Sequence, residues 1–409
     1  MSQEQLVKRL TRFYREAGAE ISSVPPVWTP GKPRPFRQLQ PVLASLVLIV
    51  LAVGLAVTLR IVHDQAENKV RLVPPPSASP SPSPAPSPSP SATPSPSWVA
   101  RHVSFGQVTA MSLDASAIFA LYAPPRDSGG FNPAQFRLAR VDRSTGALIT
   151  AGPFPNAWEL ARTAGGLWVA AGAELWAPGS DTQWLTLVDP VTLKVKQRVR
   201  LPGSPDTGIP SDPHLAATSS LMWLGYGHAL YRLDPSTGRV LSTQASPGTV
   251  TSISIDPSGH RLYTAIVPAQ TGTAQVVEWD ASTGGRIGSA PTGGGDLGGA
   301  HVAAAPGGVW ISYATGMMGA VERRADPSLS LVAGPEGGHT NSIRAFVGGG
   351  ALWLVDGAGR VTCAELRTGA AAASSQEVQP TAVVADANGS FLGDAEGVGF
   401  LRPDPSCPR

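Results

Sequence analysis

The sequence predicts an all-β fold, a seven-bladed β-propeller, for residues 98–409. A Gly-rich turn followed by a short strand with an aromatic residue recurs seven times, and a second strand that ends in an acidic turn also recurs seven times. Both repeats have a period of 38 to 55 residues, which is typical of propeller blades with about four strands each. The composition agrees with this prediction, because Gly (45) and Pro (40) are abundant and charged residues make up only 15% of the chain.

Two markers define each blade. The aromatic residue of the second strand is Phe119, Trp168, Trp223, Tyr263, Trp310, Trp353 or Phe391. The acidic residue that ends the third strand is Asp142, Asp189, Asp234, Asp280, Asp326, Glu365 or Asp404. In turns such as 234–238, Asp-Pro-Ser-Thr-Gly, the Asp can bond the backbone two residues on, and the Gly can take a positive φ. Most of the aromatics are expected to fill the core between blades.

The ring is expected to close through its N-terminal strand. The seventh unit ends after its third strand, because the sequence stops at Arg409. Residues 98–105, WVARHVSF, are strand-like and belong to no other blade, so they can supply the missing fourth strand. Such closure would remove an open sheet edge. An open solenoid is the alternative.

The segment before the propeller predicts a membrane anchor over residues 41–62. Residues 41–59 contain no charged residue, which is about the length that spans a bilayer. Residues 1–40 hold seven Lys or Arg against three Glu, so the positive-inside rule places the N-terminus in the cytoplasm and the propeller outside the cytoplasm, at the cell membrane. No A-x-A site follows the apolar run, which favours an uncleaved signal anchor over a signal peptide.

The anchor is flanked by two further segments. Residues 2–18 of the cytoplasmic segment predict a short basic amphipathic helix, which would either lie on anionic lipid or dock a cytoplasmic partner. Residues 63–97 form a linker, and 73–97 within it contain 11 Pro among mostly Ser. This composition cannot bury a core and predicts an extended spacer that is also open to glycosylation.

Charge and cysteine content exclude some classes of function. Residues 98–409 carry 21 basic and 24 acidic residues, so there is no basic excess for nucleic acid. The two cysteines, Cys363 and Cys407, are too few for a four-Cys zinc site. Outside the membrane they would be either two buried free thiols or one disulfide.

The repeats resemble a known superfamily. AHVAAAPGGVWIS with AVERRADPS, and PHLAATSSLMWLG with LYRLDPSTGRV, resemble the blades of streptogramin-lyase-like, YVTN and quinoprotein-like propellers over residues 98–409. The resemblance implies the fold, while such propellers host many activities. Quinoprotein dehydrogenases carry a Trp eight residues after the turn Asp. Here those positions are Thr150, Ser242 and Gly288, so no quinone cofactor is expected. Only His214 and His301 match the repeat histidines of the lyases.

One repeat position is rich in ionisable residues. The residues nine before the second-strand aromatic, at the start of each first strand, are Ala110, Glu159, His214, Ser254, His301, Arg344 and Ala382. First strands line the channel of a propeller, so Glu159, His214, His301 and Arg344 are expected to meet at one mouth. Trp158, Trp176 and Trp184 are expected on the same face. This pattern favours a site for a polar ligand or a divalent ion, with Glu and His as ligands or as acid and base. Alternatively, these side chains bond each other and channel water.

Three functions fit these observations. The first is a binding or scaffolding module of the cell envelope, for an extracellular protein, a glycan or a small ligand. The second is a lyase or hydrolase with its active site at the channel mouth. The third is a sensor coupled to a cytoplasmic partner of residues 2–18, a layout that resembles receptor kinases with propeller sensors, although residues 1–40 contain no kinase motif.

Overall fold

The computed structural model describes a defined part of the chain. The described residues are 97–125, 135–172, 184–201, 212–268, 273–293, 300–315, 318–333, 339–340, 343–377, 379–402 and 404–408. The predicted cytoplasmic segment 1–40, the membrane helix 41–62 and the linker up to residue 96 lie outside them. Among the described residues, no helix has the length and apolar character needed to cross a bilayer.

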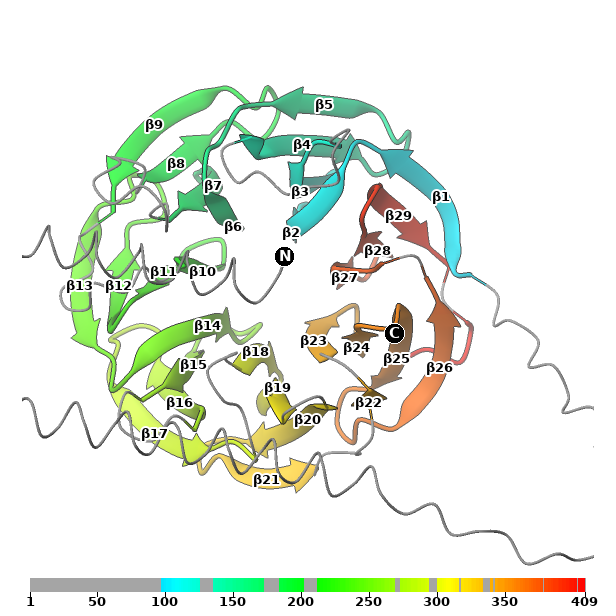
Figure 1. The fold of residues 1–409 in the computed structure, drawn as a ribbon. Helices are drawn as coiled ribbons and strands as arrows, with labels where there is room; N and C mark the ends of the chain where they lie inside the picture. Colours follow the sequence, from blue (N-terminus) through cyan, green and yellow to red (C-terminus); the bar gives the residue numbers. More distant parts are fainter. Residues whose placement is uncertain are drawn as a thin grey trace, which may run out of the picture. The chain divides into compact units, whose positions relative to one another are not determined.

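Seven antiparallel sheets surround a central axis (Figure 1). The innermost strands are β2 (Gln107–Leu113), β6 (Ala157–Thr163), β10 (His214–Ala217), β14 (Thr249–Ile255), β18 (Ala300–Ala305), β23 (Ile343–Gly348) and β27 (Ala382–Asp386). The second strands are β3 (Ala117–Ala123), β7 (Gly166–Ala171), β11 (Met222–Tyr226), β15 (Arg261–Val267), β19 (Gly308–Thr315), β24 (Ala351–Asp356) and β28 (Gly389–Gly393).

The third and fourth strands complete each blade toward the outside (Figure 1). The third strands are β4 (Arg137–Asp142), β8 (Trp184–Val188), β12 (Ala229–Leu233), β16 (Gln275–Asp280), β20 (Met318–Ala325), β25 (Arg360–Glu365) and β29 (Gly397–Leu401). The outermost strands are β5 (Leu148–Ala151), β9 (Val195–Arg200), β13 (Val240–Ala245), β17 (Arg286–Pro291), β21 (Ser330–Ala333), β26 (Ala371–Gln376) and β1 (Val99–Ser104). The short β22 (His339–Thr340) pairs with β20.

The blades form a closed ring, which confirms the predicted seven-bladed propeller. Each innermost strand contacts the innermost strand of the next blade, and β27 contacts β2. The last blade is closed as predicted, because β1 pairs antiparallel with β29, with His102 opposite Gly399 and Ser104 opposite Gly397. The Arg101 guanidinium lies 3.7 Å from the centre of the Phe400 ring, which adds a cation–π contact to this closure.

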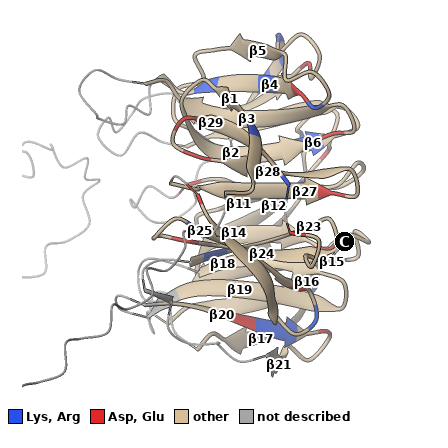
Figure 2. Ribbon diagram, turned by 90° about the vertical axis from the view of Figure 1, so that its right-hand side faces the viewer, with Lys and Arg blue, Asp and Glu red and all other residues tan. Residues whose placement is uncertain are grey.

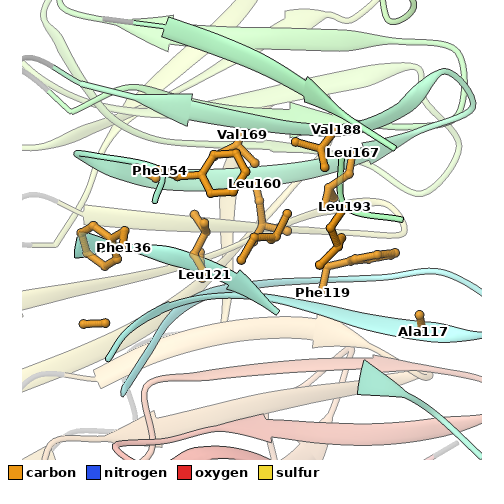
Figure 3. Close-up of a cluster of buried hydrophobic side chains, with 14 residues drawn as sticks. Ala117, Phe119, Leu121, Phe136, Phe154, Leu160, Leu167, Val169, Val188 and Leu193 are labelled. Atoms are coloured by element: carbon orange, nitrogen blue, oxygen red, sulfur yellow. The ribbon is translucent and has the colours of Figure 1, made fainter. Parts of the chain in front are cut away.

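The hydrophobic core lies between neighbouring blades. Second strands such as β3, β7 and β24 are buried along their whole length, because a blade packs on each of their faces. One cluster joins Phe119 and Leu121 of the first blade to Leu160 and Val169 of the second (Figure 3). Outermost strands such as β9 are mostly exposed. The predicted role of the aromatic marker as core between blades is thus confirmed.

Three tryptophan markers contact the turn that follows the acidic marker of the next blade. Indole Nε1 donates a hydrogen bond to a backbone carbonyl in the third-to-fourth-strand turn of the next blade, from Trp168 to Pro235 at 2.8 Å, from Trp223 to Ala281 at 2.9 Å and from Trp310 to Leu366 at 3.0 Å. In the first of these turns Gly238 has φ 66°, and a Cβ there would lie 2.8 Å from the Trp168 ring. Both the turn conformation and the close approach of the ring therefore require glycine.

Candidate functional site

The innermost strands enclose a cavity of about 650 Å³ along the axis. All seven blades contribute to its wall, mostly with small or aliphatic side chains such as Ala216, Ile253 and Val383. Charged residues are sparse on the described strands and turns seen in Figure 2. Among the described residues that line the cavity, Glu159, His301 and Arg344 are the ionisable ones. Packing alone therefore does not explain the ionisable side chains in this wall.

Strand pairing sets these side chains at one level. Glu159 lies opposite Ala170, His301 opposite Ser312 and Arg344 opposite Val355. His214 likewise lies opposite Gly225. In every case the facing residue is two positions after the aromatic of the second strand. The structure therefore brings the four predicted residues to the same end of the channel, where the innermost strands begin.

Glu159 and His214 form a pair across adjacent blades. His214 Nδ1 lies 3.6 Å from Glu159 Oε1, and Glu159 keeps 36% of its side chain exposed. Asp212, which was not predicted, lies two residues before His214 and is half-buried. Burial raises the pKa of Asp212, the nearby His214 imidazole opposes this rise, and the Glu159 carboxylate adds to it. This sector of the mouth holds two carboxyl groups and one imidazole.

His301 and Arg344 form the other ionisable sector. Burial lowers the pKa of His301 to about 3, with further contributions from Arg344 and His214, so its imidazole is neutral at pH 7. A neutral imidazole can donate one hydrogen bond and accept another. Arg344 is exposed and makes no hydrogen bond or ion pair with any residue that the structure describes. Among the described residues, Arg344 thus presents an unpaired guanidinium to the cavity.

In the fourth blade, the residue predicted for the repeat position, Ser254, is wrong by two residues. Ser254 lies opposite Tyr263 itself, whereas Ser252 lies opposite Ala265 and so takes the equivalent place. Both hydroxyls accept hydrogen bonds from the backbone of the fifth blade, Ser252 from Val302 N at 3.2 Å and Ser254 from Ala304 N at 3.0 Å. These serines therefore join blades.

The predicted tryptophans do not line the described part of the cavity. Trp158 occupies an irregularity of strand pairing between Ala157 and Glu159, and its ring lies 6.4 Å from that of Phe136. Trp184 begins β8, a third strand, and lines a separate pocket of about 150 Å³ with Phe154. Trp184 lies away from the channel because β8 is a third strand, whereas Trp158 belongs to the innermost strand β6 but sits at its pairing irregularity and is not among the residues that line the cavity. Trp176 lies outside the described residues.

Asp212 is the residue that sequence reasoning missed. It precedes the repeat position by two residues, and the preceding residues 202–211 belong to a long connection without a repeat pattern. Its sequence signal is the Asp-Pro-His run at 212–214, which places a carboxyl directly beside a predicted site residue.

No metal centre emerges from the described residues. They contain no group of three or more His, Cys, Asp or Glu side chains that could hold a metal ion. Away from the mouth, Cys363 and Cys407 are joined by a disulfide, with a Cα–Cα distance of 5.7 Å. This bond links β25 of the sixth blade to the C-terminal tail.

No protein-family model and no curated protein matches the sequence. Among solved structures, the crystal structure of BamB from Moraxella catarrhalis is similar, with a TM-score of 0.47 and 15% sequence identity. The alignment covers 73% of this chain and 85% of that chain.

Proposed function

We propose that this chain is a membrane-anchored, extracytoplasmic binding module of the cell envelope, which holds a polar small ligand at the mouth of the propeller channel. The observation that carries the proposal is the convergence of Glu159, His214, His301 and Arg344 at one level, with Arg344 unpaired among the residues that the structure describes. A concave, largely apolar cavity with a few convergent polar groups is the usual form of a ligand site.

Two observations support the extracytoplasmic location. The excess of Lys and Arg before residue 41 predicts a cytoplasmic N-terminus. The Cys363–Cys407 disulfide is of a kind that persists in oxidising compartments. Protease added to spheroplasts should therefore release the propeller, and a fully protected C-terminus would contradict this orientation.

Ligand binding can be tested by affinity selection. The protein is incubated with a defined library of small polar metabolites, and retained compounds are identified by mass spectrometry. The wild type should retain at least one compound that Arg344→Ala and His301→Ala lose, with affinities lower by about tenfold or more, because hydrogen bonds to charged groups are strong. Thermal unfolding of Arg344→Ala should match the wild type, since Arg344 is exposed and unpaired among the described residues.

Arg367→Ala is the matched control, because Arg367 is also exposed but lies in the turn after β25. This variant should retain the same compounds as the wild type. If the wild type retains nothing that Arg344→Ala loses, the channel mouth is not a ligand site.

A second candidate is a hydrolase or lyase at the same mouth. The observation that favours it is the His214–Glu159 pair at 3.6 Å, with Asp212 beside it as a carboxyl whose pKa is raised. A carboxyl group with a raised pKa is better suited to act as a general acid than an ordinary carboxyl group. If the wild type chemically converts a retained compound and the Asp212→Asn variant does not, the result would favour the enzyme over the binding module.

A further inference from the structure

The charges that line the cavity have opposite signs on its two sides. Among the described lining residues, Arg344 carries the one positive charge and Glu159 the one negative charge, since His301 is neutral at pH 7. Arg344 belongs to the sixth blade and Glu159 to the second. The sixth and second blades are separated by the seventh and the first (Figure 1), and these two side chains form no ion pair with each other.

The space between these charges is lined by the smallest side chains of the repeat position. Ala382 of the seventh blade lies opposite Gly393, and Ala110 of the first blade lies opposite Leu121, at the level of Arg344 and Glu159. The equivalent places in the other blades hold Glu, His, Ser, His and Arg. The described part of the mouth therefore has room beside the seventh and first blades, between one cation and one anion.

Arg344 and Glu159 differ in whether a neighbouring side chain already pairs with them. Arg344 has no partner among the described residues, so its planar guanidinium can take a carboxylate through two parallel hydrogen bonds. His301, on the neighbouring fifth blade, can donate a further hydrogen bond to the same group. Glu159 has His214 at 3.6 Å on one oxygen and is still 36% exposed, so it can accept hydrogen bonds from an ammonium group.

From this arrangement we infer that the ligand is a small zwitterion, such as a short free peptide, whose carboxylate meets Arg344 and whose ammonium meets Glu159 across the gap at Ala382 and Ala110. The inference rests on the proposed binding function and adds the chemical class of the ligand. A ligand with one charge would meet only one of these two groups, leaving either the Arg344 guanidinium or the exposed part of the Glu159 carboxylate without a ligand partner. The apolar wall beside the gap, including the half-buried Met111 and Val384, suits the uncharged middle of such a molecule.

The experiment uses the full chain and four forms of the peptides Ala-Ala and Ala-Ala-Ala. These are the free peptide, the N-acetyl form, the C-terminal amide and the form capped at both ends, measured by isothermal titration calorimetry. The free peptide should bind best, and each cap should weaken binding about tenfold or more through loss of one charge-assisted contact. Arg344→Gln should bind the C-terminal amide as well as the free peptide, because the charge that would meet the ligand carboxylate is gone. Glu159→Gln should likewise bind the N-acetyl form as well as the free peptide, because the charge that would meet the ligand ammonium is gone.

Two exposed positions outside the cavity wall provide matched controls. Arg367→Gln and Glu396→Gln remove the same charges from exposed turn residues and should leave all affinities unchanged. Equal binding of free and N-acetyl peptides by the wild type would overturn the inference, as would absence of binding by every peptide form. The library selection separates the two proposals. Retained compounds that carry one charge or none, and depend on Arg344, would uphold the binding site while rejecting the zwitterion.

Discussion

At the scale of single residues, Glu278 is the most unusual side chain outside the channel. It lies in β16, is fully buried, and neither of its carboxyl oxygens has a hydrogen-bond partner among the described residues. Arg261 Nε lies 3.2 Å from Oε1. Burial and the nearby Asp326 carboxylate raise the pKa of Glu278 from 4.5 to about 7, against the opposing charge of Arg261. The folded state therefore favours the protonated carboxyl.

The raised pKa of Glu278 predicts that the stability of the folded protein depends on pH. Because the folded pKa lies above the unfolded one, the contribution of Glu278 to stability is fully present below about pH 4.5 and is lost as pH rises through 7. Glu278→Gln keeps an uncharged side chain of similar shape. Its free energy of unfolding should therefore exceed that of the wild type by an amount that grows between pH 4.5 and 7, by about 1–3 kcal/mol.

Urea unfolding at a series of pH values measures this difference. The comparison between variant and wild type removes the titration of other groups, such as His301. Glu396→Gln changes an exposed carboxyl and should show a difference that does not depend on pH. A flat difference for Glu278→Gln as well would show that Glu278 is ionised throughout this range in the folded protein.

At the scale of strands and turns, the sequence predicted the blades well because their markers are locally determined. An Asp side chain that accepts from the backbone two and three residues on, as Asp234 does from Ser236 and Thr237, is a local feature of the turn. The hydrogen bond from Trp168 to the next blade is different. It depends on how two blades dock, so the sequence alone predicts a buried aromatic but not its partner.

The error in the fourth blade has a simple cause. Counting back from the aromatic assumes that the turn between the first two strands has one length. Six blades obey this rule, but in the fourth blade Ile255 pairs with Leu262 across the turn 256–261, which is two residues longer than the count assumes. Glycine and proline in 256–261 show a turn without fixing its length. Register was therefore predictable only where the repeat was regular.

The N-terminal strand gives the prediction at this scale. Deleting residues 98–105 should lower the melting temperature, broaden the transition and promote aggregation. It leaves the edge of β29 unpaired and removes the hydrogen bond from Trp98 N to Glu377 at 2.7 Å. Circular dichroism melts and light scattering check this. Deleting eight residues of the Pro/Ser-rich stretch, 85–92, should leave the melt unchanged, and identical melts for the two deletions would exclude a role for β1 in closure.

At the scale of the whole propeller, the ring is held together at the seventh blade from two directions. On the outside, β1 completes the sheet and Arg402 N donates to the carbonyl of Trp98 at 2.8 Å. Beyond β29, the chain turns back to the sixth blade, where Cys407 is bonded to Cys363 and both are buried. The N-terminal strand and the C-terminal tail therefore fasten the same blade, so its stability should depend on both.

The disulfide supplies the prediction for the whole molecule. It closes a loop with a sequence separation of 44 that contains the turn after β25, β26 and the seventh-blade strands β27, β28 and β29. Loop closure restricts the unfolded chain, so the bond should stabilise the propeller by about 2–4 kcal/mol. The double variant Cys363→Ala/Cys407→Ala should therefore unfold at lower urea, and wild type in reductant should unfold at the same urea concentration as the variant. Reductant should have no effect on the variant itself, which separates the bond from other actions of the reagent. Equal midpoints for oxidised wild type and variant would mean that the disulfide does not stabilise the propeller. Deleting residues 98–105 in the variant would then cost no more than the same deletion in the wild type.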